Sequence, residues 1–288
     1  MGKTWRVMLI GGAVLGALLV NAPVRAAAPV FVVNSSADTS NACTRSQCTF
    51  RAALAAANNA GSGVIQFNIP PGGAQTIEIG ATTGVGLPEV TASNVSIDAT
   101  TQPGAQAPSV RIDDPTSNSQ MSGIVFDGNN DSVRGLVITR FHGYGVLIRS
   151  TSSGDVVAGD WIGTADGSTA AGVTVEGVEV EGPNNTIGGT TAADRNVISA
   201  TTGGEGVHVS YANNTVITGN YIGTTADGMN RLPNAGAGIT LYGASTNNRI
   251  GGTTTGERNV ITGNGGQGVQ VLGVAGNGTC TGKASYNT

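Results

Sequence analysis

The sequence predicts an all-β protein, a right-handed parallel β-helix preceded by one short helix. Two observations predict this fold class. Segments of the second half of the chain recur further along it, 159–163 at 219–223 and 187–199 at 250–262, which indicates a repeat architecture. The recurring units contain short runs of Val and Ile bounded by Gly, Asn, Thr or Asp, a pattern typical of strands between turns.

The composition narrows the class further. Glycine supplies 46 of 288 residues, while charged residues make up only 11% and aromatic residues 4%. Disorder is disfavoured because 39% of the residues are hydrophobic, and collagen is excluded because the glycines lack a three-residue period. The low content of Lys and Arg disfavours a nucleic-acid-binding protein.

Residues 1–26 have the features of a secretory signal peptide. Lys3 and Arg6 precede an uncharged apolar run at 7–20, and small residues follow, with cleavage predicted after Ala26. A membrane anchor is the alternative, but this run is shorter than the roughly 20 residues needed to span a bilayer. The mature chain then has 11 basic and 18 acidic residues, a net charge of −7, and no transmembrane helix is expected in it.

The N-terminal part of the mature chain contains two of the three cysteines and one helix signal. Cys43 and Cys48 are close in sequence and are expected to form a local disulfide, which export permits; a metal site is the alternative, but no His or third Cys lies nearby. Cys280 is left without a partner. An Ala-rich helix is predicted at 50–59, with Thr49 as its N-cap.

Residues 31–61 resemble a short module named for its Cys-Ser-Leu-Arg-Glu-Ala run, which precedes parallel β-helices in many bacterial surface and secreted proteins. Cys48, Arg51 and Ala53 match that run. Ala52 departs from it, because the family's Glu would complete a capping box at the start of the helix. The resemblance implies that residues 27–62 form an end cap with no catalytic role.

The repeats place the β-helix at 63–288. The segments 187–199 and 250–262 are identical at nine of 13 positions. We expect each unit of this length to form three coils of about 21 residues, giving about ten coils. The side chains expected to point inward are those of Val137, Val146, Ile162, Ile187, Val197, Val207, Ile217, Ile222, Ile239, Ile250 and Ile261. The Asn pairs at 184–185, 213–214 and 247–248 are expected to stack their amides, with ligand binding as the alternative.

The mature chain as a whole is similar to secreted bacterial right-handed parallel β-helix proteins of the pectin-lyase-like architecture. Its stretches VIQFNIP (64–70), TIEIG (76–80), VSIDATTQPG (95–104) and VRGLVITRF (133–141) carry the resemblance together with the repeats. The resemblance implies a secreted or surface location. It implies no single reaction, because the fold hosts lyases, hydrolases, epimerases and non-catalytic adhesins.

The acidic residues give no clear catalytic set. Asp113 and Asp114 are adjacent in VRIDDP, yet none of the flanking motifs of pectin hydrolases is present, and His142 stands in FHGYG. A calcium-dependent lyase needs about three acids around the ion. Asp155, Asp160 and Asp166 lie in one region, at a spacing that does not align them on stacked coils. Asp227 recurs at the turn equivalent to Asp166, which favours a structural turn.

Other polar and aromatic residues follow the repeat. His208 takes the place of Gln270 and is expected to point outward into solvent. Trp161 and Tyr221 hold equivalent positions, either stacked on neighbours or presenting a sugar platform. Arg195 and Arg258 each follow an acid, which predicts a ladder of ion pairs at one corner.

We therefore expect a non-catalytic structural, adhesive or glycan-binding protein, secreted or on the outer surface of a bacterium. The alternative is a polysaccharide lyase or glycoside hydrolase acting on acidic polysaccharide. No catalytic residue or cofactor is assigned, and calcium is the one ion considered. Extracellular polysaccharide or a cell surface is the expected partner. The absence of a C-terminal capping pattern after 271 also predicts a truncated solenoid that associates end to end.

Overall fold

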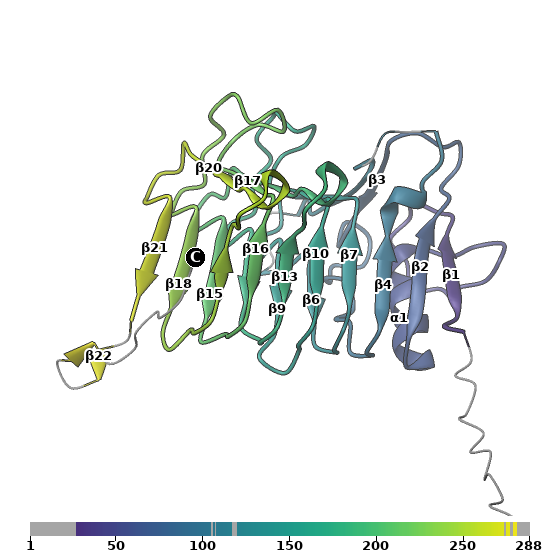
Figure 1. The fold of residues 1–288 in the computed structure, drawn as a ribbon. Helices are drawn as coiled ribbons and strands as arrows, with labels where there is room; N and C mark the ends of the chain where they lie inside the picture. The colour runs from purple at the N-terminus through teal and green to yellow at the C-terminus, as the bar shows by residue number, and fades with distance from the viewer. Residues whose placement is uncertain are drawn as a thin grey trace, which may run out of the picture.

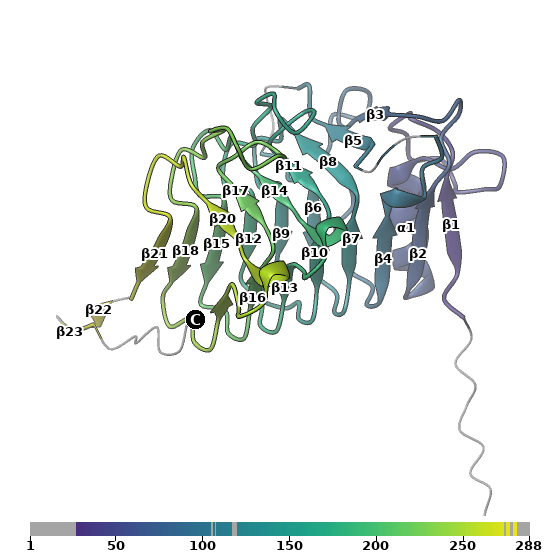
Figure 2. The same cartoon turned by 45° about the horizontal axis from the view of Figure 1, so that its top comes forward.

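The computed structural model describes residues 27–104, 106, 108–116, 120–273, 275–276 and 279–280. The chain forms a right-handed parallel β-helix whose three parallel sheets, here named A, B and C, contain eight, seven and six strands (Figure 1). Turned towards the viewer, the same sheets run side by side from α1 at one end to β21 at the other (Figure 2). Among the described residues, no helix has the length and apolar character needed to cross a membrane.

The strands of each sheet are hydrogen-bonded neighbours in the following order. Sheet A contains β1 (Val30–Val33), β2 (Gly63–Phe67), β4 (Val95–Asp98), β7 (Ser132–Arg134), β10 (Val156–Ala158), β13 (Thr186–Gly188), β16 (Val216–Thr218) and β19 (Arg249–Ile250). Sheet B contains β3 (Gln75–Glu78), β5 (Val110–Asp113), β8 (Leu136–Thr139), β11 (Trp161–Ile162), β14 (Val197–Ile198), β17 (Tyr221–Ile222) and β20 (Val260–Ile261). Sheet C contains β6 (Ile124–Phe126), β9 (Val146–Ile148), β12 (Val178–Val180), β15 (Val207–Ser210), β18 (Ile239–Tyr242) and β21 (Val269–Leu272).

The remaining elements are short. They are the α-helix α1 (Phe50–Ala60), the 3₁₀ helices η1 (Ala99–Thr101), η2 (Ala192–Asp194) and η3 (Thr255–Glu257), and the antiparallel pair β22 (Ala275–Gly276) and β23 (Thr279–Cys280).

Each turn of the β-helix passes through one strand of each sheet. Ile187, Ile217 and Ile250 occupy the same position in consecutive turns, so the repeat that joins 187 to 250 spans two turns. The prediction of three shorter coils in that repeat, and of about ten coils in all, is wrong, because the sheets form about seven turns. It failed because only Gly219 and Asn220 separate β16 from β17, so that two strands looked like one.

The interior is a stack of aliphatic side chains. Of the residues expected inside, Val146, Ile162, Ile187, Val207, Ile217, Ile222 and Ile239 are fully buried in the core. Ile250 and Ile261, in the last turn, are partly exposed but pack against it.

Val137 and Val197 were placed on the wrong side of sheet B. Both align with Trp161 in the outward column, while Ile138 and Ile198 beside them point into the core. Val137 and Val197 are nonetheless buried, because the loops that leave sheet B fold back over its outer face.

Buried polar side chains form ladders at the two corners that bound sheet A. Where the chain enters the sheet, the backbone N–H of Asp155 donates to Oδ1 of Asn185 at 2.8 Å. Where it leaves, Nδ2 of Asn196 donates to Oδ1 of Asn220 at 2.9 Å. The Asn pairs stack as the sequence predicts, since Nδ2 of Asn214 donates to Oδ1 of the Asn one turn earlier. These bonds satisfy backbone groups that the corners would otherwise bury unpaired.

The helix α1 packs against β1 and β2 at the first turn (Figure 1). Thr49 accepts a hydrogen bond from the Ala52 N–H, and Gly61 ends the helix in the left-handed conformation with φ of 76°. Arg51 is buried and forms a bidentate ion pair with Asp38, at 2.7 and 2.8 Å. Since Arg51 also donates to the Val85 carbonyl, it ties the helix to the first turns.

Cys43 and Cys48 are joined by a disulfide in the structure. It lies in the loop between β1 and α1, and the Cys48 side of the bridge is buried against the core. The side chain of Cys280 lies outside the described part of the chain, so its predicted lack of a partner stays a prediction.

Candidate functional site

The outer face of sheet C is where the sequence departs from its repeat. One outward column along this face consists of Val125, Leu147, Glu179, His208, Thr240 and Gln270. Only Glu179 and His208 carry ionisable groups there. Oε2 of Glu179 lies 2.8 Å from Nδ1 of His208, and Glu179 is buried. The strand register thus brings together an acid and a base that are 29 residues apart.

A second column, just before the strands of sheet C, adds two more carboxyl groups. Glu176 precedes β12 and Glu205 precedes β15, and the backbone hydrogen bond from Gly177 N–H to the Glu205 carbonyl places them side by side. Burial raises the pKa of Glu176 to about 7, and the negative charge of Glu179 contributes to this rise.

The Glu179–His208 pair responds to burial and to its neighbours in opposite ways. Burial raises the pKa of Glu179, against the effect of the hydrogen bond from His208. Burial lowers the pKa of His208, but the hydrogen bond to Glu179 and the surrounding carboxylates outweigh this, so that the pKa of His208 is raised. The pair therefore favours an imidazolium beside a carboxylate.

Two tyrosines extend this site towards the next turn. The ring of Tyr242 on β18 lies 5.9 Å from the His208 ring, and Tyr211 meets Tyr242 edge to face at 5.5 Å. Tyr211 is 55% exposed. Its ring fits because Gly243 has no side chain, since a Cβ there would lie 2.7 Å from that ring. We call the set the sheet C site, defined as Glu176, Glu179, Glu205, His208, Tyr211 and Tyr242.

The sheet C site contains the described group of side chains that could hold a metal ion. One ligand atom each from Glu176, Glu179 and His208 can be chosen so that all lie within 4.8 Å of one another. Two carboxylate oxygens and an imidazole nitrogen are ligands that divalent metals accept in proteins.

The acids predicted near position 113 are structural. Asp113 accepts hydrogen bonds from Oγ1 of Thr139 and Nε of Arg140. Asp114 is buried, accepts from the Thr116 N–H, and has an oxygen 3.6 Å from Nδ1 of His142. These contacts hold the end of β5 against the next turn.

The acids considered as calcium ligands are not brought together. Asp155 and Asp160 belong to the two different corner ladders. Asp166 lies in an exposed hairpin turn, where its carboxylate accepts from the N–H groups of Ser168 and Thr169, and these hydrogen bonds hold its pKa well below the usual range. Asp227 accepts from the Met229 N–H in the equivalent turn, so the recurrence marks a turn, as the sequence indicates.

The aromatic pair on sheet B is covered by those turns. A Cβ on Gly167 would lie 3.1 Å from the Trp161 ring, and one on Gly228 would lie 2.9 Å from the Tyr221 ring. Trp161 and Tyr221 hold equivalent positions two turns apart, with Val197 between them. They stack on their neighbours and do not form an open platform.

The predicted corner ladder of ion pairs is wrong in its pairing. Asp194 pairs with Arg134, and Glu257 pairs with Arg249, while the Arg195 guanidinium lies 4.2 Å from the centre of the Tyr221 ring. Adjacent residues of an extended chain point to opposite sides, so an arginine does not reach the acid before it. Asp194 and Glu257 instead close capping boxes with Thr191 and Thr254.

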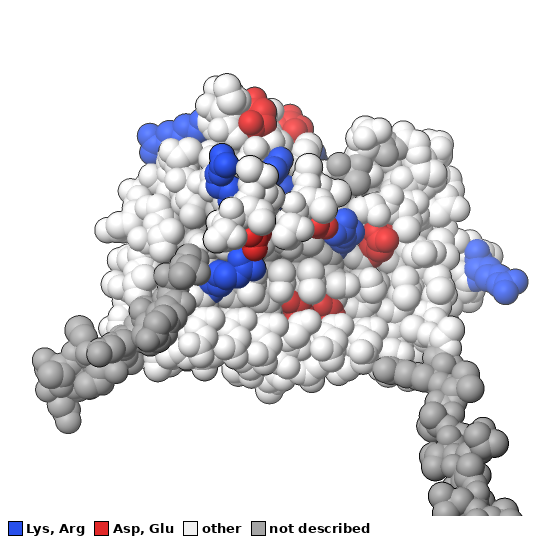
Figure 3. Space-filling view, in the orientation of Figure 1, with Lys and Arg blue, Asp and Glu red and all other residues white. Residues whose placement is uncertain are grey.

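Charged side chains are sparse over the rest of the surface. On the face shown in Figure 3, basic and acidic groups lie close together in the upper part, and most of the remainder is uncharged. A cavity of about 450 Å³ is lined by Trp161, Arg134 and Arg195, yet both arginines are already engaged by Asp194 and Tyr221.

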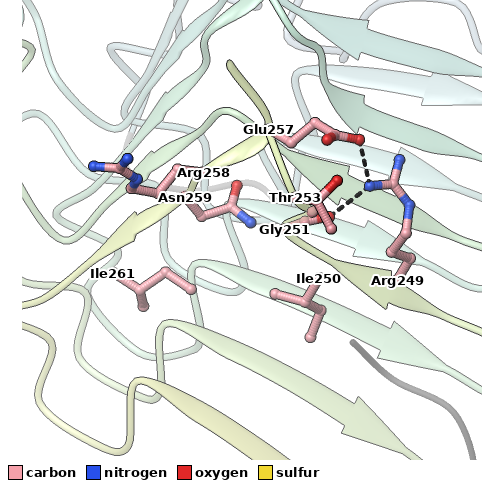
Figure 4. A pocket seen from close by; sticks show the side chains of 9 residues that line it. Arg249, Ile250, Gly251, Thr253, Glu257, Arg258, Asn259 and Ile261 are labelled. Atoms are coloured by element: carbon pink, nitrogen blue, oxygen red, sulfur yellow. Dashed lines mark hydrogen bonds and ion pairs between the residues drawn. The ribbon is translucent and has the colours of Figure 1, made fainter. Parts of the chain in front are cut away.

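A second hollow, of about 600 Å³, lies at the last described turn. It is lined by Ile250 and Ile261, and Arg249 reaches Glu257 and the Gly251 carbonyl across it (Figure 4). Its apolar lining is the same stack that fills the interior of the earlier turns, so this hollow is the end of the core.

The sequence did not single out Glu176, Glu179 or Glu205. It placed His208 outward correctly but predicted a solvated side chain, whereas His208 is hydrogen-bonded and mostly covered. The missing signal was the alignment of neighbouring turns. The repeat aligned residues that lie two turns apart, and Glu179 meets His208 only when consecutive turns are aligned.

Comparisons with known proteins agree on the fold. The family described as "Right handed beta helix region" matches residues 122–285. The solved structure "Crystal structure of pectate lyase Pel9A" has a TM-score of 0.50 and 15% identity, covering 77% of this chain and 55% of that chain. This chain thus spans about half the length of that structure, and likeness at such identity shows the fold alone. No curated protein matches the sequence. With more than half of its length matched, the chain belongs to the right-handed β-helix family.

Proposed function

We propose that this chain is a secreted, non-catalytic β-helix protein that binds extracellular glycan at the sheet C site. The observation that carries the proposal is the aromatic pair Tyr211–Tyr242 lying against the Glu179–His208 pair. The repeat predicts uncharged residues on this face, so the cluster is a local addition to the scaffold.

The chemistry of the site suits a sugar chain. Tyrosine offers a flat apolar face with a polar tip, which packs against the C–H groups of a sugar ring and bonds its hydroxyls. The carboxylates of Glu176 and Glu205 and the His208 ring supply acceptors and donors within the same area. The exposed ring of Tyr211 requires no rearrangement to make such a contact.

The charge of the site favours a neutral glycan over an acidic one. Glu176, Glu179 and Glu205 lie together, and among the described residues none of them forms an ion pair with Lys or Arg. Uronate groups would be repelled by these carboxylates. This argues against the alternative of a lyase or hydrolase on acidic polysaccharide, which rests on similarity of fold.

The test is binding of the full chain to immobilised neutral and acidic glycans, followed by calorimetry with the best ligand. We expect Tyr242→Ala to weaken binding by about tenfold, as loss of one aromatic contact predicts. Tyr221→Ala is the matched control, because Tyr221 lies on sheet B beneath Arg195, and it should leave the affinity unchanged.

A product assay decides between binding and catalysis. The full chain is incubated with the same glycans, with and without calcium, and reducing ends and unsaturated products are measured. We expect neither to form. Product formation that is lost in Glu179→Gln would overturn the non-catalytic role and favour the enzyme alternative.

A further inference from the structure

We infer that Glu176, Glu179 and His208 form a binding site for a divalent cation of the zinc class. The inference concerns the metal alone and does not rest on glycan binding. Nothing in the family match or in the similar fold assigns a metal to these three residues.

The geometry is close to that of a coordinated ion. Zinc holds nitrogen and oxygen ligands at about 2.0–2.2 Å, which separates neighbouring ligand atoms by roughly 3.4 Å in a tetrahedron. Nδ1 of His208 and Oε2 of Glu179 are 2.8 Å apart, and Glu176 supplies a third atom within 4.8 Å of both. A shift of the half-buried Glu176 side chain by roughly 1 Å would complete a three-ligand set.

The backbone already fixes two of the three ligands. Glu179 and His208 are direct neighbours on β12 and β15, and Glu179 is buried at 4% exposure. A cation placed here would enter a site that strand pairing has organised, with the fourth position open to solvent on the side of Glu176.

The local charge is unbalanced without a cation. Glu176 and Glu205 lie beside the Glu179–His208 pair, and the nearby Arg149 is paired with Glu89. Oγ1 of Thr240 lies 3.4 Å from an oxygen of Glu205, which positions that carboxylate next to the ligand set. Carboxylates of this kind commonly orient and charge-balance the groups that bind a metal.

The donor set selects the ion. Calcium takes six to eight oxygen ligands, whereas one imidazole nitrogen with two carboxylates matches the three protein ligands of open zinc sites. We therefore expect zinc to bind well and calcium and magnesium to bind weakly or not at all.

The experiment uses the full chain without a histidine tag, in a Cys280→Ser background so that no additional thiol contributes. Zinc chloride is titrated by calorimetry and in thermal unfolding, with calcium chloride as the comparison. We expect one zinc ion per chain and, at 100-fold excess over Kd, a rise in Tm of roughly 5–10 °C. Cobalt chloride should give the visible absorption of a tetrahedral ion.

Matched variants locate the ion. His208→Gln introduces the residue that Gln270 supplies two turns later, and we expect it and Glu179→Gln to weaken zinc binding at least 100-fold. His142→Gln removes the other histidine and should change nothing. Unfolding in EDTA shows whether each variant is folded. Zinc binding that survives both His208→Gln and Glu179→Gln, that is lost in His142→Gln, or that calcium equals would overturn the inference.

Discussion

At the scale of single residues, the most informative position is Asp160. It occupies the corner position that Asn196, Asn220 and Asn259 hold in later turns. The amide of Asn196 donates to the Val157 carbonyl of the preceding turn, so the equivalent Oδ2 of Asp160 faces an acceptor. That oxygen is buried and has no hydrogen-bond partner, and a proton on it would supply the missing donor.

Burial raises the pKa of Asp160 to about 8, although Arg134 and several backbone N–H groups lower it. Asp131, in the other ladder, has its pKa raised to about 7, also by burial. Because the folded state holds these protons more tightly than the unfolded chain, their contribution to stability is complete below about pH 4 and is lost as pH rises to about 8.

We predict that Asp160→Asn increases the free energy of unfolding at pH 9 by about 2–4 kcal/mol and changes it little at pH 4. The amide supplies the donor that deprotonation removes. Guanidinium unfolding at both pH values measures this. Equal effects at the two pH values would contradict the assignment of a protonated Asp160.

A second residue-scale prediction concerns the disulfide. Mass mapping of the unreduced protein should give a peptide pair joined through Cys43 and Cys48, with Cys280 free. These two bridge partners are five residues apart, so the loop is short and the bridge shapes the approach to α1 more than it stabilises the fold. A link between Cys43 and Cys280 would contradict the prediction.

At the scale of elements, the cap illustrates how a local sequence pattern becomes tertiary structure. Thr49 and Gly61 set the ends of α1, and the Ala-rich face lies close to β1 and β2. The ion pair of Arg51 with Asp38 then fixes the helix, with side-chain exposures of 5% and 1%.

We predict that Arg51→Ala lowers the free energy of unfolding by about 3–5 kcal/mol, because Asp38 would be left buried without its partner. Arg45→Ala is the control, since Arg45 lies in the exposed loop of the same cap. Chemical unfolding of both variants measures the difference, and a loss below about 1 kcal/mol for Arg51→Ala would show that the ion pair does not hold the cap.

The elements also show what could be predicted from sequence. Helix caps and Val-Ile strands are local signals, so α1, the parallel β-helix and most inward side chains followed from pattern. Strands of two residues, such as β11 and β17, are too short to show periodicity, and the turn count failed there. The Glu179–His208 contact depends on the register between consecutive turns, which a repeat spanning two turns does not reveal.

At the scale of the whole molecule, stacking of turns determines both stability and exposed surface. Every strand of sheets A, B and C pairs with its neighbours except at the two ends. On β21, the last strand of sheet C among the described residues, Val269, Val271 and Leu272 are 40–48% exposed. An apolar strand with an open edge is a template for association.

We therefore predict that the chain associates in a concentration-dependent way through β21. Val271→Lys should reduce association, because a charge on an edge strand opposes pairing. Met229→Lys is the control, as Met229 is 82% exposed in a separate loop. Sedimentation equilibrium measures the effect, and a monodisperse monomer at high concentration would contradict the prediction.

Glycan binding at the sheet C site is the central claim for this β-helix. Hydroxyl-radical footprinting tests it most directly, with the rate of oxidation of each tyrosine compared in the free chain and with saturating glycan. We predict protection of Tyr211 and Tyr242 and no change at Tyr221 on sheet B. Protection of Trp161 and Tyr221, with Tyr211 and Tyr242 unaffected, would contradict it.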